Sequence, residues 1–423
     1  MNSTPIASRS GPRPGPAVAL GLVILCIEGY DLFILGAVGP SLLAHPDWEV
    51  TKSTLGLLGS LTALGMPLGS IAAGWAGDAF GRRLPMAVSL AWLSVSMLLS
   101  AIAGDLTLFA ATRFLTGMGI GALIPLVTAY VSDAATPGRH SLHVGTATTG
   151  LAIGGIITGV VGRTLLPEWD FRTLFFFGVI PLLLVPVVYR MVPAGIHDRP
   201  AAAAHTEEAE EEAGRLRQLL GPANRRSTLL FWSATFTGLV IVYGASTWLP
   251  ALMVDAGYDL GSSLEFSIAF NIGAVVGTIG AAVIADRGAL KAATMVSFGL
   301  AAVAMIVLCT PQPRFLLLVA SAVAGFGALG TQALVNIYVA HSHPANLRGT
   351  ALGFSLGVGR LGAIAGPSYV AAATVVIDSS TAGFYAFVVP AVLGAVLIGL
   401  MKTSRRPTAE AVTETRTEAP LAP

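Results

Sequence analysis

The sequence predicts an all-α polytopic membrane protein, with twelve transmembrane helices arranged as two six-helix repeats. Of its 423 residues, 54% are hydrophobic and only 11% are charged, which is far less charge than a soluble globular protein carries. The apolar residues gather into segments of roughly 20 residues, the length that a helix needs to cross a hydrocarbon core of about 30 Å. Several residues also recur at a constant distance along the chain, which indicates an internal repeat.

Each apolar segment is predicted to be a helix, because an irregular or open-sheet backbone would leave unpaired polar groups in lipid. The expected spans are residues 17–43, 55–76, 84–103, 106–131, 142–165, 172–192, 228–254, 264–285, 290–309, 313–340, 349–375 and 382–402.

Basic residues indicate on which side of the membrane each loop lies. With both termini inside, most of the 24 Lys and Arg residues fall in cytoplasmic segments, and the outside holds only Lys52, Arg163, Arg172 and Arg314. The positive-inside rule therefore predicts cytoplasmic termini. We expect a multi-pass protein of a bacterial cytoplasmic (inner) membrane.

A long polar gap between the sixth and seventh segments divides the chain into two halves. Its acidic run and the arginines that follow are typical of a solvated linker. The predicted organisation is a cytoplasmic tail (1–16), a first six-helix bundle (17–192), a cytoplasmic linker (193–227), a second six-helix bundle (228–402) and a disordered cytoplasmic tail (403–423).

The halves repeat each other at a constant offset of 208 residues. The matched residues are Asp78 with Asp286, Arg83 with Lys291, Gly117 with Gly325, Gly119 with Gly327, and Tyr130 with Tyr338. A single offset that relates residues in three helices and a loop is not expected by chance. Parallel six-helix repeats are the design of one class of membrane transporter, which holds its substrate near the membrane midplane between the halves.

Two acidic residues lie in the middle of the first apolar segment. Glu28 and Asp31 are three positions apart, so they share one face of a helix. A mid-membrane Asp costs roughly 2.5 to 3.5 kcal/mol on insertion scales, so this face must look into protein or a water-filled cavity. The pair either holds helices together or binds a transported proton, and we favour the proton site because intramembrane acids are functional by default.

The loop after the second segment carries the motif GWAGDAFGRR at residues 74–83, which matches every fixed position of G-x-x-x-D-x-x-G-R-[RK]. It resembles the signature of the major facilitator superfamily. The resemblance implies a cytoplasmic gate formed by Gly74, Asp78, Gly81, Arg82 and Arg83.

Charged partners for this gate are expected at the end of the fourth segment and in the loop after it, at Asp133 and Arg139. The copy in the second half, Asp286 and Arg287, lacks the glycines and is degenerate. The alternative is that the paired arginines of the motif only anchor the topology, and the complete motif argues against it.

Four further stretches resemble the aromatic acid:proton symporters of this superfamily. They are Glu28-Gly29-Tyr30-Asp31 with Gly39-Pro40-Ser41-Leu42, Arg113 to Gly121 with Pro125, Tyr243 to Tyr258, and Gly359 to Ala363 with Gly366-Pro367. The resemblance implies that the two first-helix acids, the fourth-helix Arg and the gate motif are functional. Glu28 departs from the family pattern, where Asp is usual, so we expect Asp31 to carry the proton.

An aromatic carboxylate needs a cation, aromatic walls and a group that takes up a proton. Two arginines lie deep within the predicted bilayer, one in each half. The expected lining residues are Arg113, Arg360, Tyr30, Phe33, Tyr243, Trp248, Gln332, Asn336 and Tyr338. Structural roles stay open for each: an ion pair for the arginines, packing for the aromatic residues, and helix bridging for the two amides.

These features together predict a secondary transporter that imports a benzoate- or hydroxybenzoate-like acid by proton symport through alternating access. Its partners would be a small aromatic carboxylate, a proton and the lipid bilayer, and we expect a monomer. The alternatives are an exporter, a transporter of another organic anion, and a sensor that binds ligand without moving it.

Other functional classes lack their signatures. No G-x-x-x-x-G-K-[ST] motif is present, which argues against ATP as the energy source, and no Ser/His/Asp arrangement suggests an enzyme. The seven histidines and two cysteines do not pair at metal-binding spacing, so neither a metal nor a cofactor is expected. The net charge of +1 implies no nucleic-acid partner.

Overall fold

The computed structural model describes residues 14–136, 139–193, 211, 213–286, 289–344, 346–377 and 381–401, and their regular secondary structure is entirely helical. The first half comprises α1 (Pro14–Leu43), α2 (Lys52–Phe80), α3 (Arg83–Ala101), α4 (Leu106–Ala134), α5 (His140–Leu165), α6 (Arg172–Phe176), η1 (Phe177–Val179) and α7 (Ile180–Met191). The second half comprises α9 (Arg225–Asp255), α10 (Leu260–Asp286), α11 (Leu290–Leu308), α12 (Arg314–Gly325), η2 (Phe326–Gly330), α13 (Thr331–Ser342), α14 (Arg348–Ile377) and α15 (Ala382–Gly399).

Within these residues, twelve helical spans are long and apolar enough to cross a membrane. The predicted polytopic all-α fold is thus confirmed, and each predicted span ends within about four residues of the observed one. The differences fall where helices continue into polar residues, as at both ends of α2, because hydropathy detects only the apolar part. The tenth span contains a π-helical turn, η2, between α12 and α13.

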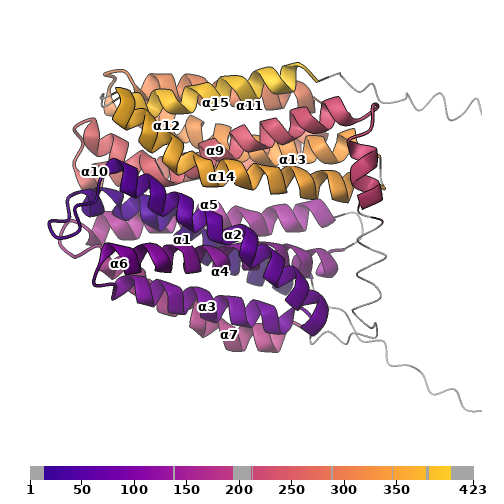
Figure 1. Ribbon diagram of the computed structural model, residues 1–423, viewed down its shortest axis with the longest axis horizontal. Coiled ribbons are helices and arrows are strands. Elements are labelled where there is room, and N and C mark those ends of the chain that lie inside the picture. Colours follow the sequence, from indigo (N-terminus) through magenta and orange to yellow (C-terminus); the bar gives the residue numbers. More distant parts are fainter. Residues whose placement is uncertain are drawn as a thin grey trace, which may run out of the picture.

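The chain folds into two helical bundles that lie side by side (Figure 1). In the half coloured indigo to magenta, α1 packs on α5 and α2 packs on α4, while α3 and α7 lie further out. In the half coloured pink to yellow, α9 packs on α14 and α10 packs on α12, with α11 and α15 outside. This is the arrangement that the sequence repeat predicts.

Glycines at repeat-related positions make the same close contacts in both halves. A Cβ added to Gly65 of α2 would overlap the carbonyl oxygen of Phe114, and one added to Gly273 of α10 would overlap that of Ala322. Gly273 lies 208 residues after Gly65, and Ala322 lies 208 residues after Phe114. The same offset relates the contacts Gly69–Met118 and Gly117–Thr62 to Gly277–Phe326 and Gly325–Phe270. The repeat therefore preserves backbone-to-backbone packing, which only small residues allow.

The ends of the bundle differ. We call the end that holds the last residues of α2, α4 and α13 the linker end, because residues 213–224 lie there, and the opposite end the far end. Toward the far end the halves pack directly: an added Cβ at Gly36 would overlap the Ser246 carbonyl, and one at Gly159 would overlap Ile268.

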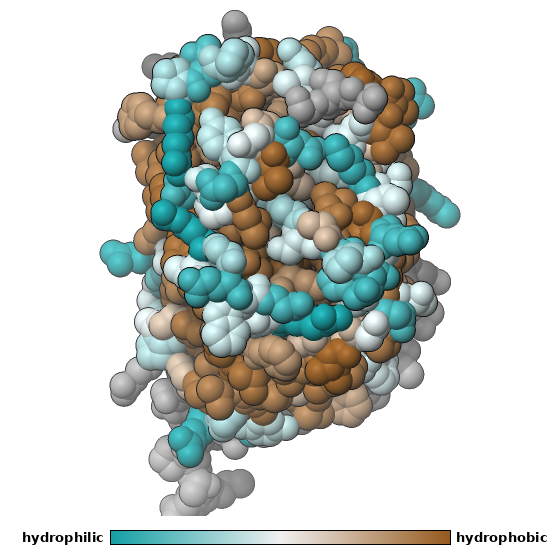
Figure 2. All heavy atoms as spheres, turned by 90° about the vertical axis from the view of Figure 1, so that its left-hand side faces the viewer, coloured by the Kyte–Doolittle hydropathy of each residue, from teal (hydrophilic) through white to brown (hydrophobic). Residues whose placement is uncertain are grey.

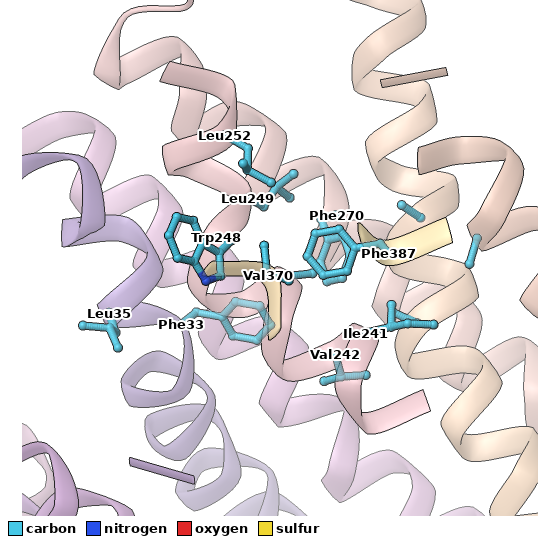
Figure 3. Close-up of a cluster of buried hydrophobic side chains, with 14 of the residues drawn as sticks. Phe33, Leu35, Ile241, Val242, Trp248, Leu249, Leu252, Phe270, Val370 and Phe387 are labelled. Carbon is cyan, nitrogen blue, oxygen red and sulfur yellow. The ribbon is translucent and has the colours of Figure 1, made fainter. Parts of the chain in front are cut away.

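Aromatic and aliphatic side chains complete this contact between the halves. Phe33 and Phe270 lie 6.5 Å apart between ring centroids, and Figure 3 shows Phe33 and Leu35 of α1 beside second-half side chains that include Trp248 and Val370. Toward the linker end, Gly145 of α5 and Gly353 of α14 have open space beside them. The close contacts between the halves therefore gather toward the far end.

The surface fits a membrane protein. Figure 2 looks onto the far end, where hydrophilic side chains gather over the helix ends while hydrophobic ones form the flanks. Large apolar side chains such as Ile71, Leu183 and Val376 are exposed. In water such a surface would be unfavourable, whereas in a bilayer it contacts lipid.

The glycine contacts lead to a stability prediction. Gly273→Ala should destabilise the protein by about 1 to 3 kcal/mol, the usual cost of overpacking, because the added methyl group would overlap Ala322. Gly299→Ala in α11 is the control, since no heavy atom lies within 4 Å of its Cβ position, and it should leave stability equal or slightly higher. Thermal unfolding in one detergent measures both, and equal melting temperatures would contradict the close packing.

Candidate functional site

A buried ion pair joins α1 and α4. Arg113 Nη1 donates to Asp31 Oδ1 over 3.2 Å, and the two residues are 0% and 1% exposed. Removing one partner of such a pair leaves an uncompensated charge in a medium of low dielectric constant, which costs about 3 to 5 kcal/mol. The pair therefore has to stay together unless another charge replaces one member.

Residues of the first half also enclose the rest of the Arg113 guanidinium. Its Nη2 donates to Ser100 Oγ over 2.7 Å and to Thr116 Oγ1 over 2.9 Å. The Phe175 and Phe109 rings lie 4.7 and 5.6 Å from its central carbon, close enough for cation–π attraction. Arg113 is thus held rigidly inside its own half.

Glu28 lies one helical turn from Asp31 but has a different environment. It is 0% exposed, and neither carboxylate oxygen has a hydrogen-bond partner among the described residues. Its electrostatic partners include Arg360 of α14, and Arg360 also acts on Tyr243 of α9. Glu28 therefore interacts across the boundary between the halves, whereas Asp31 interacts within one half.

A small pocket lies between α1, α2, α4 and α9, next to the ion pair. Its walls are Asp31, Leu32, Leu35, Gly59, Thr62, Ala63, Arg113, Tyr243, Ser246 and Thr247. Residues of both halves line it, and it combines a cation, an acid and hydroxyl groups with apolar walls. These groups match a small molecule with an anionic end and an apolar body, but the free volume of about 10 Å³ holds no more than about one water molecule in this conformation.

The predicted gate motif surrounds the linker-end turn between α2 and α3. Gly81 adopts a φ of 71°, a left-handed conformation that favours glycine. Arg82 forms an ion pair with Asp133 at the end of α4. Arg83 Nε donates to the Val192 carbonyl over 2.9 Å. These contacts all lie within the first half.

The other predicted gate residues make fewer contacts. Asp78 and Arg139 are exposed, and neither forms an ion pair within the part of the chain that the structure describes. Gly74 is exposed, with open space beside it. Arg287 lies outside the described residues, and Asp286 is described only as the last residue of α10. Among the described residues, the contacts of the gate motif thus stay within the first half.

Comparison with known proteins identifies the family. The profile of the Major Facilitator Superfamily matches residues 21–367. This chain belongs to the major facilitator superfamily. Members are transporters, not enzymes.

Its relatives in this superfamily are transporters of aromatic acids. The gentisate transporter of Corynebacterium glutamicum is 36% identical over 83% of this chain and 79% of that protein. The benzoate transport protein of Acinetobacter baylyi is 29% identical over 94% of this chain and 91% of that protein. A D-xylose–proton symporter shares the fold, with a TM-score of 0.76 at 17% identity over 91% of this chain and 97% of that one.

Of the aromatic residues predicted to line the site, Tyr243 alone combines contact with the pocket and interaction with Arg360. The Tyr30 hydroxyl donates to the Leu174 carbonyl over 2.9 Å within the first half. Trp248 is 0% exposed and donates from Nε1 to the Pro367 carbonyl over 2.9 Å. Tyr338 packs against Phe231 near the linker end.

The two predicted amides pair with each other on α13. Gln332 Nε2 donates to Asn336 Oδ1 over 3.0 Å, and Gln332 Oε1 faces the Gly238 position of α9. Both are half-buried in the second half, directly after the π-helical turn η2. Gln332 Oε1 has no hydrogen-bond partner among the described residues, so the two amides bond each other rather than another helix.

Sequence reasoning did not single out several residues that the fold brings to the site. Ser100 and Phe175 contact Arg113 from other helices, and no local pattern marks them. Asn271 of α10 is fully buried against Gly155 of the opposite half, and its Oδ1 has no hydrogen-bond partner among the described residues. A lone amide in an apolar run was a signal that could have identified it.

The two acids should differ in their effect on stability. Asp31→Asn should lower the stability by about 3 kcal/mol, because it leaves Arg113 buried without a counter-charge. Glu28→Gln is the matched control and should have a much smaller effect, because no hydrogen-bond donor holds its carboxylate. Thermal unfolding at neutral pH in one detergent compares them. An equal loss for both variants would show that the Asp31–Arg113 pair is not the stabilising interaction.

Proposed function

We propose that this protein imports an aromatic carboxylate together with a proton by alternating access. The observation that carries the proposal is the arrangement of four charged residues: Asp31 and Arg113 form an ion pair inside the first half, while Glu28 and Arg360 interact electrostatically from different halves without a direct ion pair. The relatives, named as transporters of gentisate and benzoate, support the substrate class.

The charge balance explains why proton and substrate would move together. Asp31, Arg113, Glu28 and Arg360 sum to zero when all are ionised. A proton on Asp31 alone would leave the four groups with a net charge of +1, and a substrate anion alone would leave them with −1; either costs several kcal/mol in this environment. Binding both restores neutrality, so the doubly loaded state is favoured over either singly loaded state.

Arg360 is the better candidate for the substrate carboxylate. It is half-buried rather than enclosed, and it lies within electrostatic range of Glu28 and Tyr243. A planar guanidinium pairs with a carboxylate through two parallel hydrogen bonds, and the nearby Tyr243 ring suits an aromatic body. In this proposal Glu28 neutralises Arg360 while no substrate is bound.

The positive-inside distribution of basic residues supports a cytoplasmic linker end. Contacts between the halves that gather at the far end then fit an inward-facing state, in which substrate and proton have left. The formed Asp31–Arg113 pair fits that state, because Asp31 would be ionised after it releases its proton.

Substrate uptake by proteoliposomes tests the proposal directly. Labelled aromatic acids should accumulate when the pH gradient is directed inward, and accumulation should collapse when a protonophore removes the gradient. Accumulation that is driven only by a gradient directed outward would instead indicate an exporter.

The substrate class leads to a binding prediction. A benzoate-type acid should bind at least about tenfold more tightly than its amide, a difference of about 1.4 kcal/mol, because a cation in a low-dielectric cavity favours an anion. Arg360→Lys should reduce this preference, since Lys cannot make the planar two-point pair. Competition against a labelled acid measures both. Equal affinity for acid and amide would favour a neutral substrate.

The proton site leads to a transport prediction. Asp31→Asn cannot release a proton, so it should lose accumulation driven by a pH gradient yet still exchange labelled for unlabelled substrate, which needs no net proton movement. Glu28→Gln should keep coupled uptake at lower substrate selectivity. Both activities are normalised to protein in the membrane. Accumulation by Asp31→Asn at the wild-type level would exclude Asp31 as the proton carrier.

A further inference from the structure

Charged side chains join the two halves at the far end. Lys52 at the start of α2 lies 2.6 Å from Asp255 at the end of α9, measured from Nζ to Oδ2. Arg163 of α5 lies 2.8 Å from Glu265 of α10, measured from Nη2 to Oε1. Glu265 also pairs with Arg314 of α12. Two of these three pairs therefore cross from one half to the other.

The two crossing pairs have the same polarity. The first half contributes both cations and the second half both acids, so the two rims are electrostatically complementary. Complementary charge across a contact fixes how two surfaces meet more than it adds affinity.

The linker end lacks such connections within the part of the chain that the structure describes. The ion pair there between Arg82 and Asp133 joins two helices of the first half. The pair between Glu211 and Arg215 lies within the linker. Among the described residues, the ion pairs that join the halves therefore lie at the far end, where the halves are in contact.

We propose that the Lys52–Asp255 and Arg163–Glu265 pairs form a far-end latch, which holds the far end closed and has to open in every transport cycle. The proposal rests on alternating access but not on the substrate or on the proton site.

The exposure of these groups suits a contact that opens and closes. The four latch side chains are 19% to 54% exposed, so water can solvate each charge once the pair separates. Partly exposed ion pairs contribute modestly and are screened by salt. A fully buried pair such as Asp31–Arg113 would resist opening much more strongly. The latch should therefore favour the closed far end without preventing it from opening.

A single cysteine can report on the opening of the far end. Ser60 of α2 is 8% exposed, and its Oγ lies 2.7 Å from Ser368 Oγ of the opposite half. Ser60→Cys is nearly isosteric and would place a thiol at the contact that has to separate. The native Cys26 and Cys309 are replaced by Ser, and a bulky maleimide labels the protein in lipid nanodiscs without any substrate.

Two arginine variants supply a matched comparison. Arg163 and Arg314 share the acid partner Glu265 and have similar exposure, but only Arg163 belongs to the other half. Arg163→Gln should raise the labelling rate about two- to fivefold, the range for a partly exposed ion pair. Arg314→Gln should leave it unchanged. Equal increases for both variants would overturn the latch, because local loosening of α10 would then suffice.

The Lys52–Asp255 pair allows a test in which the two charges are exchanged between the halves. Lys52→Gln and Asp255→Asn should each raise labelling, and the double variant Lys52→Asp/Asp255→Lys should return the rate toward that of the parent. Raising the salt concentration should speed labelling of the parent but not of a variant that lacks both crossing pairs. Parent-like labelling in every single variant, or a double variant that labels faster than either single variant, would overturn the proposal.

Discussion

Charge inside the membrane-spanning bundle has to be compensated, because an unpaired ion in a low-dielectric interior costs several kcal/mol. The four midplane charges meet this constraint in two ways. Asp31 and Arg113 neutralise each other inside one rigid half. Glu28 and Arg360 belong to different halves, so their mutual neutralisation depends on how the halves are placed. The electrostatic interaction between Glu28 and Arg360 therefore changes when one half moves relative to the other.

The packing within each half supports this division. Repeat-related glycines bring α2 against α4 and α10 against α12 at backbone distance, and such contacts leave little room for sliding. The contact between the halves includes such an approach, at Gly36 beside the Ser246 carbonyl, but side chains, ion pairs and the serine pair Ser60–Ser368 form other parts of it. These contacts can separate and solvate. Movement is therefore expected at the boundary between two bodies that each stay intact.

The strength of each ion pair depends on how deeply the pair is buried. The fully buried Asp31–Arg113 pair, with its Ser, Thr and Phe surroundings, would break only when another charge compensates. The pairs at the far end are partly exposed and individually weak. A transporter needs both kinds. A strong buried pair disfavours the states in which only the proton or only the substrate is bound, and weak pairs let the halves separate within one cycle.

Hydropathy and the repeat were enough to predict twelve spans, their approximate ends and two equivalent halves, because lipid forces each apolar segment into a helix and repeated glycines mark repeated contacts. The same reasoning identified Glu28, Asp31, Arg113 and Arg360, since a charged residue inside an apolar run can be recognised from the sequence alone. The motif at 74–83 likewise identified the superfamily, but it was predicted to be a loop, whereas α2 continues to Phe80 and only Gly81 and Arg82 lie between the helices.

The pairing of those charges came only from the tertiary structure. Glu28 and Asp31 share a helix face, yet one meets Arg113 and the other interacts with Arg360, because that face borders α4 on one side and the second half on the other. The enclosing residues Ser100 and Phe175, and the partners of Lys52 and Arg163, lie far away in sequence and carry no local signal. Sequence by itself determined which residues are costly in a membrane, whereas the fold decided which of them compensate one another, since compensation requires contact in three dimensions.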